Sequence, residues 1–140
     1  MLKKALIVLA SIGLLDAIYL TWIKLANQVA QCAGIGDCEA VNSSPYSEIA
    51  GIPIALLGAA AFLVMLLVLL FEEHNEILRE NGPLLVVAIS LVGVLYSVYL
   101  TYLEIFVIKA ICPYCVLSAL VLVVLLILSW RRLSAQWDQV

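Results

Sequence analysis

The chain has 140 residues, of which 66% are hydrophobic and 12% charged, and its formal net charge is −3. Soluble domains are usually near half apolar and a quarter charged, so this composition excludes an ordinary soluble domain and a disordered chain. The mean hydropathy of +1.17 and the lack of a basic run in the sequence favour a small polytopic membrane protein that contacts a lipid bilayer and no nucleic acid.

Four long stretches with few or no charges predict four transmembrane helices, because a spanning helix needs ~20 apolar residues. We place these helices near residues 4–25, 51–71, 83–106 and 112–130, with an outer loop at 26–50. The first stretch is alternatively a signal peptide, but apolar residues resume after Asp16 and no small-x-small cleavage site follows. We therefore expect an all-α, four-transmembrane-helix bundle in a single domain over 1–140. A short helix near 45–50 is expected to lie on the membrane surface.

The distribution of positive residues predicts the orientation of the bundle. With four spans both termini share one side, together with Lys3, Lys4, Arg79, Arg131 and Arg132. Lys24 and Lys109 fall on the other side. Because Lys and Arg favour the cytoplasmic side, we expect cytoplasmic termini and an outer face that carries all four cysteines. The acidic segment 72–76 is expected to be a solvated connector.

The first and third helices resemble each other. Residues 13–25 align without gaps to residues 93–105 at an offset of 80, and both contain Tyr-Leu-Thr. The same offset brings Cys32 onto Cys112. Each half then contains a helix, a cysteine pair and a second helix, and both halves start on the same side. This pattern predicts a parallel internal repeat.

The four cysteines form two pairs with different spacing. Cys32 and Cys38 flank a glycine-containing segment of the outer loop, and Cys112 and Cys115 form Cys-Pro-Tyr-Cys at the start of the fourth helix. Disulfides persist in an oxidising outer compartment, and four cysteines permit three pairings. Cysteines at i and i+3 share one helical face, and Pro113 suits the first helical position, which makes Cys112 the expected cap.

A pliable loop pair and a fixed pair at the membrane edge together suggest an electron relay to a lipid-soluble oxidant. Two structural disulfides are an alternative. A four-cysteine zinc site is another, although Cys-x5-Cys is wide for a zinc knuckle, and no metal ligands are expected. A cysteine-dependent metal-ion transporter would want its cysteines inside the span, whereas these lie at the outer edge.

The order of motifs resembles the vitamin K epoxide reductase family over nearly the whole chain. These motifs are the segment from Cys32 through Cys38 to Ser44-Pro-Tyr-Ser, then Gly51-Ile-Pro-Ile, then Cys112-Pro-Tyr-Cys115. The bacterial disulfide-bond-forming B proteins carry Cys-x-x-Cys in the first outer loop, so the order here differs. Many prokaryotic members have a fused thioredoxin-like domain after the last helix. This sequence has ten residues after Trp130, so we expect a stand-alone homologue whose partner is separate.

The resemblance implies a membrane oxidoreductase that carries electrons from a thioredoxin-like (DsbA-like) dithiol protein in trans to a quinone. Cys32 would receive them, Cys38 would attack the Cys112–Cys115 disulfide, and Cys115 would face the quinone, which is of the ubiquinone, menaquinone or vitamin K type. Ser44 would support the quinone site, or would instead cap a helix near Pro45. The outcome would be disulfide formation outside the cytoplasm, with vitamin K epoxide or quinone reduction as the alternative role.

Three further features are of interest. Asp16 lies mid-span, about fifteen ångströms below the cysteines by helix rise. We interpret it as a protonated interior residue, hydrogen-bonded to a Tyr or Ser of a neighbouring helix. Lys24 and Glu104, aligned by the repeat, are expected to pair across helices or to reach the headgroups. The expected interfacial anchors are Trp22, Tyr102 and Trp130.

Overall fold

The computed structural model describes residues 2–25, 48–49, 52–108 and 113–139. Within these residues there are four long helices, each long and apolar enough to cross a membrane. They are α1 (Leu2–Leu25), α3 (Ile54–Phe71), α4 (Glu76–Leu103) and α5 (Pro113–Asp138), and α4 continues as the π-helix η2 (Glu104–Ile108). The predicted all-α bundle is confirmed.

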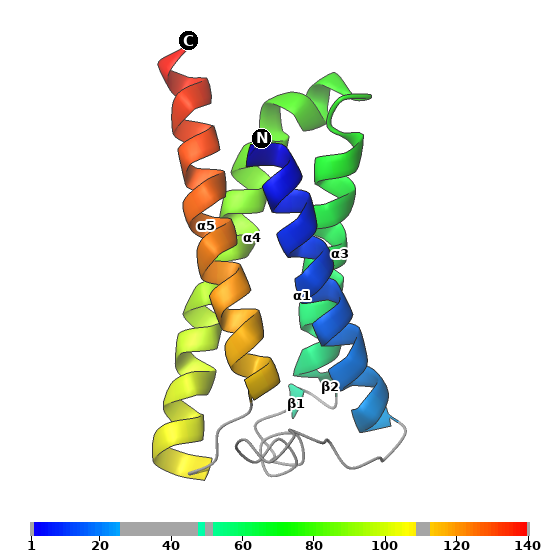
Figure 1. Cartoon of the computed structure of the whole chain (residues 1–140), viewed down its shortest axis with the longest axis vertical. Coiled ribbons are helices and arrows are strands. Elements are labelled where there is room, and N and C mark those ends of the chain that lie inside the picture. The colour runs from blue at the N-terminus through cyan, green and yellow to red at the C-terminus, as the bar shows by residue number, and fades with distance from the viewer. Residues whose placement is uncertain (1, 26–47, 50–51, 109–112, 140) are drawn as a thin grey trace.

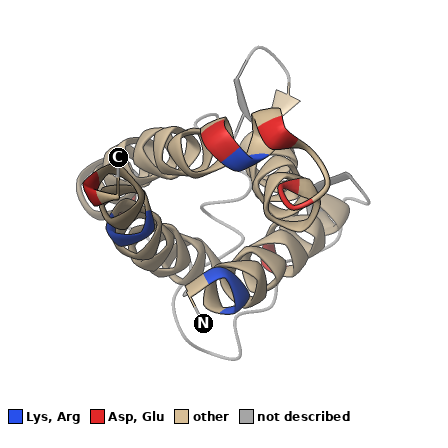
Figure 2. Ribbon diagram, turned by 90° about the horizontal axis from the view of Figure 1, so that it is seen from above, with Lys and Arg blue, Asp and Glu red and all other residues tan. Residues whose placement is uncertain are grey.

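The four helices run alternately up and down (Figure 1). Both termini and the α3–α4 connection lie at one end of the bundle, which we call the terminal end. The opposite end, the loop end, carries the two short strands and the first residues of α3 and α5. The most extensive helix contacts are within the pairs α1–α3 and α4–α5, and α1 also packs on α5. Viewed from above, the helices form a four-sided bundle (Figure 2). The two halves of the repeat are therefore two helix pairs.

A two-stranded antiparallel sheet precedes α3. Strand β1 (Glu48–Ile49) pairs with β2 (Ile52–Pro53), so that Ile49 lies opposite Ile52. The expected short helix near 45–50 is therefore wrong at residues 48 and 49, because a β-branched isoleucine in each strand favours extended backbone. The rest of that expectation lies outside the described residues.

Helix α4 begins at Glu76, seven residues before the predicted position. Asn75 caps it, because its side-chain oxygen accepts a hydrogen bond from the Ile77 backbone N–H at 3.0 Å. The predicted span begins at residue 83, but Pro83 lies buried inside the helix. The first part of α4 crosses the terminal end before the helix turns downward (Figure 1). A kink of this kind is expected where proline removes a backbone donor.

Helix α5 also exceeds its prediction, since it continues to Asp138 rather than ending near 130. The added residues, Arg131 to Asp138, are mostly polar and good helix formers. The first charged residues after a charge-free stretch mark the end of the apolar span, whereas the helix continues beyond that point. The last turns of α5 consequently project past the other helices at the terminal end (Figure 1).

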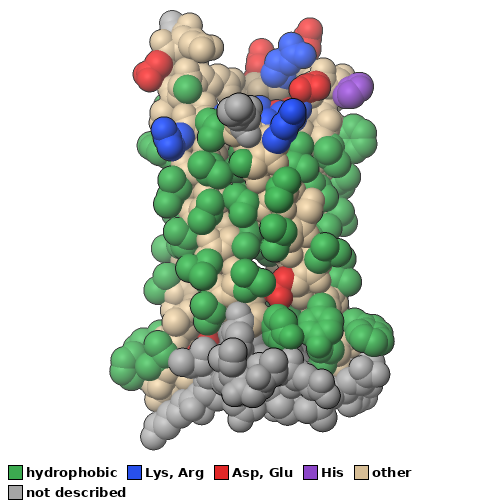
Figure 3. Space-filling model, in the orientation of Figure 1, with side chains coloured by type: hydrophobic (Ala, Val, Ile, Leu, Met, Phe, Trp, Pro, Cys, Tyr) green, Lys and Arg blue, Asp and Glu red, His purple; other side chains and the backbone are tan. Residues whose placement is uncertain are grey.

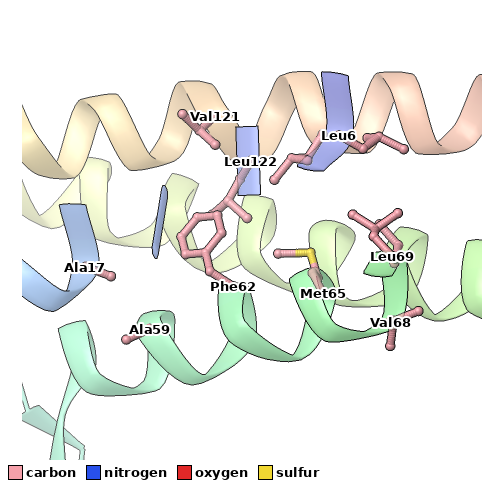
Figure 4. Packing of buried hydrophobic residues seen from close by; sticks show 11 residues of the cluster. Leu6, Ala17, Ala59, Phe62, Met65, Val68, Leu69, Val121 and Leu122 are labelled. Atoms are coloured by element: carbon pink, nitrogen blue, oxygen red, sulfur yellow. The ribbon is translucent and has the colours of Figure 1, made fainter. Parts of the chain in front are cut away.

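The core is apolar and includes a close helix contact at Gly13. Leu6, Phe62, Met65 and Leu125 are each 2% exposed or less, and Figure 4 shows side chains of this cluster meeting between the helices. A Cβ at Gly13 would overlap the Phe62 ring. Such close approach at a small residue is how helices associate in membranes, where water provides no driving force.

A cluster of ion pairs lies at the terminal end. Glu72, the residue that follows α3, is 3% exposed. Arg132 of α5 donates to both carboxylate oxygens of Glu72, one of them at 3.2 Å. The Lys3 ammonium nitrogen lies 3.7 Å from Glu72 Oε1. Lys3 also bonds Glu73 at 2.7 Å. The prediction of a solvated connector is therefore wrong for Glu72, which draws α1, α3 and α5 together.

The outer surface of the helices is apolar over most of their length. Figure 3 shows hydrophobic side chains over the long middle belt and basic and acidic groups gathered at the terminal end. Many large hydrophobic residues are exposed, including Trp22, Tyr102 and Trp130 at 54% or more. A lipid environment accounts for this exposure.

Candidate functional site

The candidate site begins at the first turn of α5. Pro113 is the first residue of the helix, as predicted, and the half-buried Cys115 is the third. Backbone N–H groups of a first helical turn have no partner within the helix and favour a nearby negative charge. A thiolate at this position is therefore stabilised by the helix itself, which is the property that a redox cysteine needs.

One turn further into the bundle, α5 meets α1 through a polar contact. The Ser118 hydroxyl donates a hydrogen bond to the Asp16 carboxylate, and Asp16 is 9% exposed. The interpretation of Asp16 as an interior residue bonded to a serine of a neighbouring helix is confirmed in its geometry. Ser118 itself was missed, because a serine among apolar helical residues reads as a small packing residue.

The depth expected for Asp16 is wrong with respect to Cys115. Ser118 follows Cys115 by three residues, which is about 4.5 Å of helix rise. The hydrogen bond to Ser118 therefore places the Asp16 carboxylate about one turn from the level of Cys115, not fifteen ångströms below it. The reason is that α5 begins inside the bundle: its first turn lies closer to the terminal end than the loop-end termini of α1 and α4 do (Figure 1).

An aromatic contact lies on the loop-end side of this pair. The rings of Tyr19 and Tyr114 have centroids 5.3 Å apart and planes tilted by 57°. Tyr19 is one turn from Asp16 on α1, and Tyr114 directly precedes Cys115 on α5. The same two helices thus meet at an aromatic pair and a polar pair, with Cys115 between them along α5.

The other predicted site residues are placed as follows. Cys32, Cys38, Ser44 and Cys112 lie outside the described residues. Glu104, at the start of η2, is 3% exposed, so it does not extend to the headgroups. Its expected pairing with Lys24 stays a prediction, because the Lys24 side chain is outside the described part. The structure therefore brings Cys115, Ser118 and Asp16 to one region, and only the first of these was a predicted site residue.

Comparison with known protein families gives one match that covers most of the chain. Residues 4–130 match the sequence model of the vitamin K epoxide reductase family. The matched range contains all four helices' apolar parts and all four cysteines. The chain therefore belongs to the vitamin K epoxide reductase family and is a multi-pass membrane oxidoreductase.

Proposed function

We propose that this chain, acting as one domain, relays electrons from a thioredoxin-like dithiol protein to a quinone and so supports disulfide formation outside the cytoplasm. In this relay the partner reduces the Cys32–Cys38 pair, and Cys38 then attacks Cys112 of the second pair. The resulting Cys112–Cys115 dithiol returns to the disulfide as the quinone becomes a hydroquinone. Two electrons and two protons pass in each cycle, so the exchange balances.

The observation that carries the proposal is a family match that includes both cysteine pairs. The position of Cys115 supports it, because a half-buried residue in the first turn of a membrane helix can meet a lipid-soluble oxidant. Cys115 is accordingly assigned as the thiol next to the quinone. Ser44 is assigned to the same site, where its hydroxyl would hydrogen-bond a quinone oxygen.

The orientation of the bundle is part of the proposal. Lys3, Arg79, Arg131 and Arg132 belong to the terminal end, where Figure 3 shows the basic groups gathered. Since such residues favour the cytoplasm, the terminal end faces inward and the cysteines face the oxidising outer compartment. A membrane-impermeant thiol reagent should then label reduced cysteines in intact cells. Labelling that appears only after permeabilisation would contradict this orientation.

The direct test uses purified protein, a reduced thioredoxin-like dithiol protein and a soluble ubiquinone or menaquinone analogue. We expect dithiol-dependent loss of quinone absorbance, and no such loss in a variant with all four cysteines changed to serine. Failure of the wild type with every quinone offered would contradict the proposal. Turnover of vitamin K epoxide at a higher kcat/KM than the quinones would favour epoxide reduction as the main role.

A further inference from the structure

Asp16 is a carboxyl group that the electron relay leaves without a role. It is the one charged residue in the sequence between residues 5 and 23, and it is nine-tenths buried. Ionisable groups inside spans are costly and usually take part in a function. The hydrogen bond from Ser118 accounts for how the carboxyl is held, but not for why a carboxyl stands there.

Ser118 connects the carboxyl to the redox end of α5. Its hydroxyl hydrogen points to Asp16, so its oxygen lone pairs stay available to accept another hydrogen. Cys115 and Ser118 are three residues apart on α5 and therefore lie on one helical face. A serine hydroxyl that donates on one side and accepts on the other is suited to pass a proton between a thiol and a carboxylate.

The other buried carboxyl group on the α4 side of the described bundle is Glu104, at the start of η2. Helix α3 has no charged residue, α5 has none from Pro113 to Trp130, and α4 has only tyrosines as ionisable groups between residues 81 and 103. Tyr19, one turn from Asp16 on α1, and Tyr114, one turn from Ser118 on α5, bring their rings into contact nearby. Among the described side chains, Asp16 is thus a carboxyl group that a hydrogen bond joins to the face of α5 that carries Cys115.

We propose that Asp16 is a positioning residue for proton transfer, and that its carboxylate, acting through Ser118, receives the proton that Cys115 loses during oxidation. This inference rests on the proposed function. In the step, the S–H bonds of Cys112 and Cys115 break and the S–S bond forms. The electron pair reduces the quinone, and its two oxygens take up the two protons. Asp16 holds one of these protons in transit and ends the cycle unchanged.

The first test measures quinone reduction by pre-reduced protein as a function of pH. Asp16→Asn keeps the size of the side chain and an acceptor for Ser118, but it cannot take up a proton. We expect a fall of about 10²-fold at neutral pH, the usual loss when a proton acceptor is removed, with recovery as the pH rises and the thiolate forms unaided. Asp16→Glu should restore part of the rate. Ser118→Ala should resemble Asp16→Asn, and the double variant should be no slower than either single one.

The second test needs no quinone. In a background with Cys32, Cys38 and Cys112 changed to serine, the rate at which a small permeant maleimide alkylates Cys115 reports its thiolate. Asp16→Asn should make alkylation several-fold faster at neutral pH, because a carboxylate one turn away opposes a second negative charge. The same substitution thus speeds alkylation and slows quinone reduction. A purely structural role for Asp16 would not move the two rates in opposite directions.

The matched control is Ser129→Ala. Ser129 is a buried serine of the same helix whose hydroxyl bonds only the carbonyls of Leu125 and Leu126, at 2.6 and 3.2 Å, among its described contacts. It should leave both rates unchanged. An unaltered alkylation rate in Asp16→Asn would overturn the proposal while the proposed function stands. Faster alkylation in a protein that reduces no quinone would overturn the proposed function while supporting the coupling of Asp16 to Cys115.

Discussion

The two helix pairs, α1–α3 and α4–α5, are built alike inside but differ where they meet. Thr21 bonds the Ala17 carbonyl at 2.7 Å, and its repeat partner Thr101 bonds the Ser97 carbonyl at 2.8 Å. The aligned glycines also behave alike, since Gly13 packs on α3 and Gly93 packs on α5. The internal repeat predicted at an offset of 80 thus recurs in the packing of each pair.

The two pairs share the apolar core, and they are also joined by polar contacts that the repeat does not duplicate. Three side-chain hydrogen bonds among the described residues cross from one pair to the other: Asp16 with Ser118, Ser90 with Met65, and Glu72 with Arg132. Tyr96 occupies the position equivalent to Asp16 and stacks with Tyr99 at 5.9 Å instead. Close apolar packing at the aligned glycines is therefore repeated in each half, whereas the polar pairs between the halves are specific to one site each.

The largest expected effect comes from the redox cysteines, whose spacing differs between the halves. Cys115→Ser should abolish quinone reduction, because the thiol assigned to face the quinone is lost. The other three cysteines can still exchange, so a Cys38–Cys112 bond should accumulate. Non-reducing mass spectrometry of peptides measures it.

The companion variant is Cys38→Ser, which removes the resolving thiol of the other half. It should trap a thioredoxin-like partner on Cys32, seen as an adduct on a non-reducing gel. Quinone reduction near the original rate in Cys115→Ser, or a partner held on Cys38 in Cys32→Ser, would contradict the assigned order.

The second effect concerns the polar contact between the halves at the terminal end. Arg132→Met should lower the free energy of unfolding by about 2–3 kcal/mol, because it leaves the nearly buried Glu72 carboxylate without its main partner. This loss is at or just below the lower end of the usual range for buried ion pairs, because the arginine side chain is 25% exposed. Thermal unfolding in detergent measures it. Arg131→Met is the matched control, because Arg131 is exposed and outside this cluster of ion pairs, and an equal loss there would contradict the role of the pair.

The third effect compares the two glycine contacts within the halves. Gly13→Ala should destabilise the protein by about 1–3 kcal/mol through overpacking, because the Phe62 ring that it meets is 2% exposed and cannot move aside. Gly93→Ala should cost less, since the new Cβ meets flexible terminal methyl groups of Leu122 at 3.0 and 3.1 Å. Thermal unfolding of the two variants in the same detergent tests the order.

Gly58→Ala is the control for helix propensity. A Cβ there meets nothing within 4 Å, so the substitution should be neutral or slightly stabilising. A second check is Phe62→Leu, which should recover part of the loss in Gly13→Ala. A greater loss in Gly93→Ala than in Gly13→Ala would show that the tighter contact lies in the other half.

Sequence patterns correctly predicted the features that depend on the residues of one helix alone. Charge-free stretches predicted the spans, and Pro113 was correctly placed as the first residue of α5. The helix ends were less certain, since Pro83 lies inside α4 and α5 continues through polar residues. Charge marks where a span leaves the apolar layer, but a helix ends only where its backbone bonds or caps end.

Features that depend on two helices at once were not predicted. Glu72 stands in an acidic run that is typical of a solvated connector, and only the approach of Arg132 reveals its burial. The level of Asp16 was misjudged because helix rise along α1 cannot report how deep α5 begins. The proximity of Asp16 and Ser118, 102 residues apart, is a property of the packed bundle.

The smallest expected effect lies beside Glu72, at its exposed neighbour. A hydrogen bond from Lys3, and then the charge of Lys3, hold the pKa of Glu73 below the ordinary glutamate value. A lowered folded-state pKa means that the pair stabilises the protein above the ordinary glutamate range and that this contribution is lost as the pH falls through the lowered pKa. Glu73→Gln should therefore reduce the melting temperature slightly at neutral pH, and the melting temperatures of wild type and variant should converge in acid.

The Glu73 side chain is 69% exposed, so high salt should also remove the difference in melting temperature. Glu80→Gln, an exposed acid on α4, should show no such convergence, and a Glu73→Gln difference that persists in acid would mean that packing rather than charge is responsible.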